Sequence, residues 1–302
     1  MLSLKPHLWF NQNDVKEAAE FYTGLLPDSA ITVIGAFQNG PSGVCNVIEF
    51  TVAGQPFLGL GAGGSLEFTP AISFMINFDP SHDPDAADRI DEVWEKLSDG
   101  GKVMMPLDRY PFSERYGWVS DKYGLSWQLI LTNPDGEERP TIVPSMMFTG
   151  EVAGSAEQAI DFYCGIFKDS KRGITARYPA GAAPDKEGTL MFADFNIDGA
   201  WMAAMDSAHP HGFYFNDAIS MLISCDTQEE IDYYWSALSA GGQGGHCGWL
   251  KDKFGVSWQV TSTVIFDAIK NGDPDQIARV ISAFMPMTRI DITMLKSAYN
   301  GD

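Results

Sequence analysis

The chain has 302 residues, which is too long for one ordinary core because domains average about 150 residues. Hydrophobic residues make up 45% and aromatic residues 12% of the sequence, enough for each half to bury a core. Forty acidic residues against twenty basic ones give a formal charge of −20. Such a surface repels nucleic-acid phosphates and anionic lipids, so we expect neither a nucleic-acid nor a membrane partner. It would suit a soluble protein or a cationic small-molecule ligand.

Residues 1–14 contain no basic stretch followed by a long apolar run, so no signal peptide is expected. No stretch approaches the roughly eighteen apolar residues that a membrane span needs. The four cysteines show no CxxC spacing. We therefore interpret them as reduced thiols in a cytoplasmic protein.

The sequence contains an internal repeat. Residues 117–128 and 248–259 are identical at eight of twelve positions and share the motif Gly-Trp-x-x-Asp-Lys-x-Gly-x-Ser-Trp-Gln. The offset between the copies falls from 141 (residue 18 to 159) to 131 (residue 117 to 248), so the first copy carries ten extra residues, within residues 102–116. The other recurring blocks are 18–26 and 159–167, 71–74 and 218–221, and 90–101 and 231–242.

Each copy predicts two units, and each unit consists of a strand, a helix and three further strands. In the first copy, the apolar side chains of residues 15–26 have helical spacing, and residues 88–97 predict a second helix that ends at Gly100 and Gly101. β-rich runs separated by glycine-containing breaks predict the strands. These runs are residues 7–10, 31–37, 46–52, 55–60, 72–78 and 126–131, with further strands near Lys102 and Trp118.

The chain thus has two copies, each with two βαβββ units, and this organisation resembles that of the glyoxalase or vicinal-oxygen-chelate superfamily. The segment Pro6-His7-Leu8-Trp9-Phe10 and the closing Asp-Lys-x-Gly-x-Ser-Trp-Gln motif are similar to its PhnB-like branch, often labelled 3-demethylubiquinone-9 3-methyltransferase-like. The resemblance implies an α+β fold of tandem glyoxalase-like domains, each of two βαβββ units that form a curved, cup-shaped mixed sheet with helices on the outer face. It also implies an internal pseudo-dimer of the two domains, with a homodimer of the chain as a further option.

The expected domains are residues 1–135 and 141–264, followed by a helical tail at residues 265–302. The turn-rich and charged segment 133–140 predicts a linker between them. In the tail, Asp273-Pro274 is a good pair for the N-cap and first position of a helix, and Asp291 predicts the start of a final helix.

The resemblance raises the question of a metal site, because metalloenzymes of the superfamily hold their ion with side chains from the first, fourth, fifth and eighth strands of the cup. His7 and Gln128 occupy the first and last of these positions, but the strands between them offer no ligand atom. In the second copy Ser145 replaces His7, which leaves Gln259 alone. A divalent ion needs three or four good donors, so we expect no metal and no other cofactor.

Two other clusters contain metal-binding residue types. His209 and His211 would meet His246 and Cys247 if their loops approach each other, but solvated histidines and a small buried thiol are the simpler interpretation. The acidic segment 79–85 looks chelating, although acidic residues are typical of helix N-termini and a helix is predicted to follow.

The methyltransferase label of the branch finds no support in the residues. Residues 59–64 contain a GxGxG pattern, but a cofactor loop of that kind needs a following helix, and the next predicted element is a strand. The corresponding residues 203–206 contain no glycine. The sequence also has no G-x-S-x-G elbow and no familiar spacing of histidine with a Ser or Cys nucleophile.

A curved sheet with aromatic and amide side chains on its inner face is a binding site. Strand alternation separates Gln128 from Trp127, and the family fold implies that the Gln128 side lines the cup. His7 and Trp9 share a face and could join Gln128, with core packing as the alternative for Trp9. Residues 109–116, in the segment that carries the ten extra residues, have the composition of a lid or represent ordinary loop variation. The predicted ligand-binding residues are His7, Trp9, Tyr110, Phe112, Trp118, Gln128, Trp249 and Gln259.

Two classes of function remain. The first is a metal-free protein that sequesters an organic or antibiotic-like molecule, as bleomycin-resistance members of the superfamily do. The second is a metal-dependent lyase, isomerase or dioxygenase of the same superfamily. The missing metal ligands favour the first class, with the cup that contains His7 and Gln128 as the working site. A further interpretation, compatible with either class, is that the second copy is a structural partner without a working site of its own.

Overall fold

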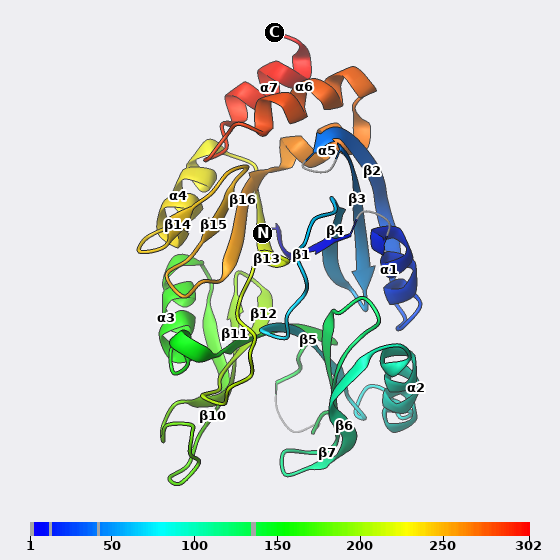
Figure 1. The fold of residues 1–302 in the computed structure, drawn as a ribbon, viewed down its shortest axis with the longest axis vertical. Helices are drawn as coiled ribbons and strands as arrows, with labels where there is room; N and C mark the ends of the chain where they lie inside the picture. Colours follow the sequence, from blue (N-terminus) through cyan, green and yellow to red (C-terminus); the bar gives the residue numbers. More distant parts are fainter. Residues whose placement is uncertain (1–2, 12–13, 41–42, 134–136) are drawn as a thin grey trace.

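The computed structural model describes residues 3–11, 14–40, 43–133 and 137–302, which form two eight-stranded mixed sheets (Figure 1). From edge to edge, sheet A consists of β14 (Gln243–Gly244), β15 (Trp249–Lys251), β16 (Ser257–Ser262), β13 (Ile219–Cys225), β1 (Ser3–Phe10), β4 (Gln55–Gly61), β3 (Gly43–Val52) and β2 (Ala30–Gly40). Sheet B consists of β10 (Lys171–Arg177), β11 (Leu190–Ile197), β12 (Ala200–Asp206), β9 (Ile142–Phe148), β5 (Ile72–Phe78), β8 (Ser126–Leu131), β7 (Ser113–Ser120) and β6 (Lys102–Tyr110).

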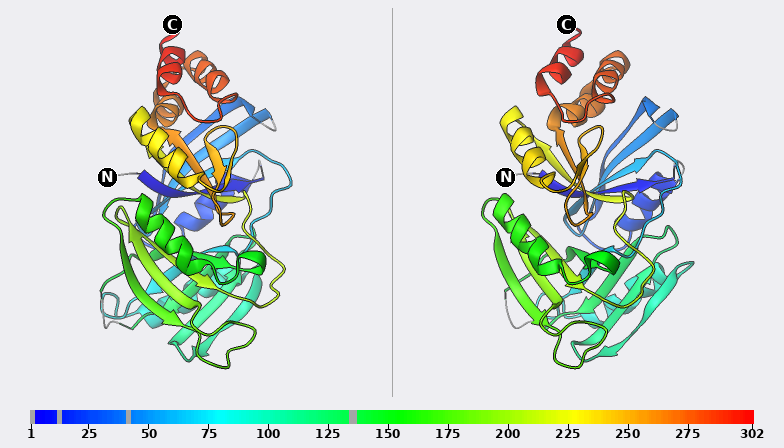
Figure 2. Two further views of the ribbon diagram at one scale, coloured as in Figure 1. Left: turned by 90° about the vertical axis from the view of Figure 1, so that its left-hand side faces the viewer. Right: turned by 60° about the vertical axis from the view of Figure 1, so that its left-hand side comes forward.

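Helices cover the outer face of each sheet. Sheet A carries α1 (Asp14–Thr23) and α4 (Gln228–Leu238), and sheet B carries α2 (Ala86–Ser98) and α3 (Ala156–Ile166), which follows a 3₁₀ turn at Gly150–Val152 (Figure 1). The C-terminal helices α5 (Thr263–Asn271), α6 (Pro274–Phe284) and α7 (Ile292–Asn300) lie at the end of the molecule that sheet A occupies (Figure 2). Within the described residues, no helix is long and apolar enough to cross a membrane.

The α+β class and the composition of each sheet from two βαβββ units are confirmed, but the two units of a sheet come from different repeats. In sheet A, β1 of the first repeat pairs antiparallel with β13 of the second. In sheet B, β5 of the first repeat pairs antiparallel with β9 of the second. The expectation that His7 and Gln128 share one cup is therefore wrong, because they lie in different sheets. As domain limits, residues 1–135 and 141–264 stay a prediction.

A proline precedes His7 in sheet A and its counterpart Ser145 in sheet B. Pro6 and Pro144 each lie one residue before the parallel ladder to the neighbouring strand begins, at His7 in sheet A and at Ser145 in sheet B. A proline there costs the parallel ladder no hydrogen bond, because that ladder has not yet started. The shared position confirms that Ser145 is the counterpart of His7.

The closing motif builds the turn before the last strand of each repeat. Asp252 accepts hydrogen bonds from two backbone amides of the turn, and its second oxygen accepts one from Trp258 Nε1 at 3.0 Å. Gly255 takes a φ of +85°, which a residue with a side chain rarely adopts. Asp121 and Trp127 repeat the arrangement at 2.8 Å. The buried tryptophan thus anchors the strand in the core, and the following glutamine faces the other way.

The segments outside the repeated core are mostly as expected. The ten extra residues of the first repeat extend the β6–β7 hairpin, whereas the matching strands β14 and β15 are short. Asp273 and Asp291 are the N-cap residues of α6 and α7, as predicted. Part of the proposed linker, residues 134–136, lies outside the described residues.

The pairing between repeats predicts that neither repeat is stable as a monomer. Residues 1–135 alone would expose the pairing edges of both β1 and β5. We expect this fragment to form dimers or larger assemblies in size-exclusion chromatography with light scattering. Co-production with residues 137–302 should restore a one-to-one complex. A monomeric fragment with a cooperative thermal transition would contradict the prediction.

Candidate functional site

The predicted ligand-binding residues divide equally between the two sheets, and most of them lie on the inner face, opposite the helices. The side chains alternate along each strand, so odd-numbered residues of β1 and β16 face inward in sheet A. His7, Trp9, Trp249 and Gln259 belong to sheet A, and Tyr110, Phe112, Trp118 and Gln128 belong to sheet B, with Phe112 in the turn between β6 and β7. The structure therefore offers two separate candidate sites.

The centre of sheet A contains a buried histidine. His7 lies directly opposite Ser220 on β13, and Gln259 Nε2 donates to Ser220 Oγ at 2.7 Å. The His7 side chain is 3% exposed, and its Nδ1 atom has no hydrogen-bond partner within the described part of the chain. Burial, helped by the nearby Lys5 ammonium, lowers the pKa of His7 from 6.5 to about 3. The imidazole is therefore neutral at physiological pH.

The centre of sheet B has the same plan without the histidine. Ser145 lies opposite Ser73, and Gln128 Nε2 donates to Ser73 Oγ at 2.7 Å. The Gln128 Oε1 atom accepts a hydrogen bond from the Tyr116 hydroxyl at 2.7 Å. Burial raises the pKa of Tyr116 above its usual range, so this hydroxyl stays protonated. In the second repeat the position of Tyr116 is occupied by Cys247, so Gln259 lacks this partner.

The donor sets of both centres do not fit a divalent metal ion. Sheet A brings together His7, Ser220 and Gln259, with Leu58 on the fourth strand. This is one imidazole beside a neutral hydroxyl and a neutral amide that already bind each other, whereas transition metals need three or four good donors. Sheet B lacks even the imidazole.

The other candidate clusters stay apart. His211 Nε2 lies 2.7 Å from Ser207 Oγ, and His209 lies 3.4 Å from Asp185, whereas His246 and Cys247 line a cavity of sheet A. No group of three or more His, Cys, Asp and Glu residues suitable for a metal exists within the described ranges.

The acidic segment 79–85 precedes a helix, as predicted. Asp85 is the N-cap residue of α2, but its side chain makes no capping bond, and Asp83 instead forms an ion pair with Arg89. The segment therefore supplies charge at the start of α2 without a side-chain cap at Asp85.

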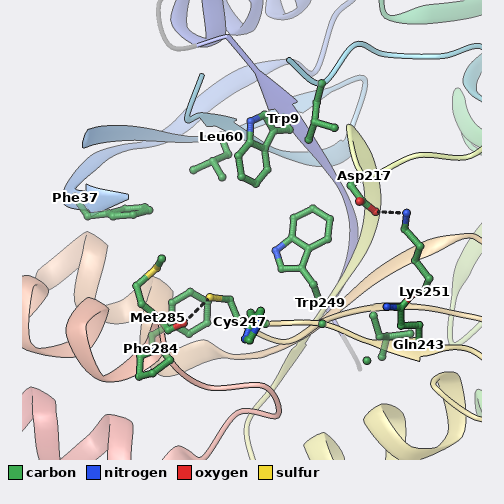
Figure 3. Close-up of a pocket in the computed structure, with 16 residues that line it drawn as sticks. Trp9, Phe37, Leu60, Asp217, Gln243, Cys247, Trp249, Lys251, Phe284 and Met285 are labelled. Atoms are coloured by element: carbon green, nitrogen blue, oxygen red, sulfur yellow. Dashed lines mark hydrogen bonds and ion pairs between the residues drawn. The ribbon is translucent and has the colours of Figure 1, made fainter. Parts of the chain in front are cut away.

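A cavity of about 1020 Å³ opens on the inner face of sheet A. Trp249 lies between this cavity and His7, with the two ring centroids 5.6 Å apart in an edge-on arrangement. Trp9 lies 6.0 Å from Trp249, and its Nε1 donates to Gly63 O at 2.7 Å. Figure 3 shows the aromatic and aliphatic side chains that surround the space, which include Trp9, Phe37, Leu60, Cys247, Trp249, Phe284 and Met285.

The C-terminal helices complete this cavity. Phe266 and Ile269 of α5 pack on the apolar inner face of sheet A, and Phe284 at the end of α6 lines the opening. Backbone hydrogen bonds join the following segment to the β14–β15 connection, from Cys247 N to Met287 O at 2.6 Å and from Gly248 N to Thr288 O at 3.0 Å. The tail is therefore a wall of the site.

The polar groups of the cavity lie at its edge. Asp217 pairs with Lys251 at 3.2 Å, and Gln243 and His246 are exposed. Burial raises the pKa of the Cys247 thiol to about 11, so the thiol is protonated at neutral pH and is not an activated nucleophile. The arrangement favours binding over covalent chemistry.

Around Trp118, the inner face of sheet B is occupied by its own side chains. Trp118, Tyr116, Met147 and Met205 form a buried cluster, and the Trp118 Nε1 donates to Ser126 Oγ at 2.8 Å. In the β6–β7 hairpin, Tyr110 stacks on Phe112, whose side chain is 59% exposed. The predicted lid is thus the tip of an edge ribbon. A second cavity, of about 820 Å³, reaches the inner face of sheet B at Met75 and Ile130 and contains many charged residues, among them the ion pair of Arg139 and Asp194.

Several site residues were not anticipated from the sequence. Ser73 and Ser220 occupy the inner face of their strands, and the shared Ala-Ile-Ser block contains the signal that would have identified them. Phe37 and Leu60 follow from strand alternation. Phe284 comes from the tail, and no local pattern predicts that it reaches the cavity.

The two sheets define a protein of the glyoxalase fold, built from paired βαβββ units. The family model of 3-demethylubiquinone-9 3-methyltransferase matches the chain twice, over residues 3–130 and 140–261, and the chain belongs to this family. A PhnB protein from Bacillus cereus is 36% identical over 42% of this chain and 98% of its own length, with a TM-score of 0.38. Glyoxalase I from Zea mays is 13% identical over 86% of this chain and 92% of its own length, with a TM-score of 0.52, and shows the shared fold. A search of curated proteins found no match.

The depressed pKa of His7 predicts a loss of stability in acid. Below pH 6.5 this histidine is protonated in the unfolded chain. In the folded chain it stays neutral until the pH falls to about 3. Lowering the pH from 7.5 to 5 should therefore cost about 2 kcal/mol at this residue alone. In urea unfolding, His7→Leu should remove this part of the pH dependence, and His82→Leu, at an exposed histidine, should retain it. An unchanged pH dependence in His7→Leu would contradict the prediction.

Proposed function

We propose that the chain is a small-molecule-binding protein that takes an apolar organic ligand into the cavity above Trp249, without a catalytic metal ion. The observation that carries the proposal is the cavity itself: about 1020 Å³ walled by Trp9, Trp249, Phe37 and tail residues. Small-molecule sites have this size and this predominantly apolar lining. Sequestration of an organic molecule, as in resistance members of the superfamily, is the role that we infer.

Methyl transfer is not part of this proposal. The glycine-rich segment at residues 59–64 leads from β4 towards the strand β5 and does not open a helix, so it lacks the helix N-terminus that a cofactor phosphate or nucleotide would use. Gly63 O instead accepts a hydrogen bond from Trp9 Nε1, so this segment holds Trp9 in place at the cavity wall.

The proposal predicts that a bulky side chain in the cavity weakens binding. A neutral fluorescent probe, N-phenyl-1-naphthylamine, should bind the native chain and raise its melting temperature, since a hundredfold excess over Kd adds about 2.7 kcal/mol. Leu60→Trp, on β4, should weaken probe binding about tenfold or more because it occupies the cavity. Ile130→Trp, at a residue that lines the cavity of sheet B, makes the matched change there and should leave binding intact. The opposite ranking would move the site to sheet B.

The proposal also predicts the metal content. The protein purified without chelator should contain well under one equivalent of Zn, Ni, Fe or Mn per chain by elemental analysis, since His7 has no second strong donor beside it. A stoichiometric ion that disappears in His7→Leu, but not in Ser145→Ala, would restore the alternative of a metal-dependent lyase, isomerase or dioxygenase.

A further inference from the structure

Trp118 and Trp249 occupy the same position of the repeated motif, but their indole groups are used differently. In sheet B, Trp118 Nε1 donates to Ser126 Oγ at 2.8 Å, and the side chain is 6% exposed. The matching serine of sheet A is Ser257. The structural role of the first tryptophan therefore predicts a hydrogen bond between Trp249 and Ser257.

The structure does not contain that bond. The Ser257 hydroxyl donates instead to Asp217 Oδ1 at 2.6 Å, and Asp217 also pairs with Lys251. The first repeat has Pro70 at the position of Asp217, so no carboxylate competes for Ser126. Within the described part of the chain, no acceptor is bonded to Trp249 Nε1.

The unused indole nitrogen faces the cavity. Figure 3 shows the Trp249 nitrogen directed towards the space between Phe37, Leu60 and Cys247. The other donors of the inner wall are occupied, because Trp9 Nε1 binds Gly63 O and the Cys247 thiol binds Met285 O at 3.3 Å. An indole N–H that an apolar ligand covers without replacing its hydrogen bond to water costs binding energy.

We propose that Trp249 Nε1 is the hydrogen-bond donor that recognises the ligand, so the preferred ligand is an apolar organic molecule with a neutral acceptor such as a ketone oxygen. The inference rests on the proposed function, since it uses the same cavity. Apolar walls select the ring system, and the single indole N–H selects molecules that present an acceptor to it.

The test uses two probes of nearly the same shape, benzophenone and diphenylmethane, which differ in the ketone oxygen. Calorimetric Kd values are measured for the native chain, Trp249→Phe and Trp118→Phe. Phenylalanine keeps an aromatic ring and removes the donor. Trp249→Phe should weaken benzophenone binding about threefold to tenfold more than it weakens diphenylmethane binding. Trp118→Phe is the matched control in sheet B. It should change the Kd of neither benzophenone nor diphenylmethane.

A second measurement follows ligand binding in the native chain and uses Trp249→Phe only to assign the indole resonance. In ¹⁵N–¹H spectra of the native chain, the indole resonance that is lost in Trp249→Phe should move downfield with benzophenone and not with diphenylmethane. Equal weakening of both probes together with an unmoved indole resonance would overturn the role of Trp249 and leave the cavity as a binding site. Failure of both probes to bind the native chain would overturn the proposed function as well.

Discussion

Antiparallel pairing between the two repeats is the constraint on which the structure depends. β1 joins β13 and β5 joins β9, so each sheet is completed by the other half of the sequence. This pairing places His7 opposite Ser220, and it brings His7 and Trp9 of β1 beside Trp249 of β15. The composition of each candidate site follows from the contact between repeats, not from either repeat alone.

The two sheets share a hydrogen-bond arrangement at their centres but differ in some of the residues around it. Each has a glutamine that donates to a serine, but Tyr116 completes this network in sheet B, and its counterpart Cys247 belongs to the wall of a cavity. The cavity of sheet B lies beside a cluster of methionine and aromatic side chains and contains many charged residues, whereas the cavity of sheet A is closed by the C-terminal helices and has mainly aromatic and aliphatic walls. The two sheets therefore share the glutamine–serine hydrogen bond at their centres and differ in the side chains that surround their cavities.

Local elements could be predicted from the sequence because their causes are local. The strand predicted at residues 72–78 is Ile72–Phe78, and the helix predicted at 88–97 extends over Ala86–Ser98. The pairing partner of β1 could not be predicted, because alternation fixes which side chains share a face and says nothing about which strand lies alongside. The contribution of Phe284 depends on how the tail folds back on sheet A, and no periodic pattern encodes that.

The pairing of β1 with β13 also sets an order of events during synthesis on the ribosome. The strand Ser3–Phe10 is made well before its partner Ile219–Cys225, which emerges about two hundred residues later. Until then β1 has no β13 to pair with, and its Lys5 and Pro6 are residue types that discourage association with a wrong strand. The wall formed by the tail follows later still, so the nascent chain has no closed cavity until residues 266–286 have emerged.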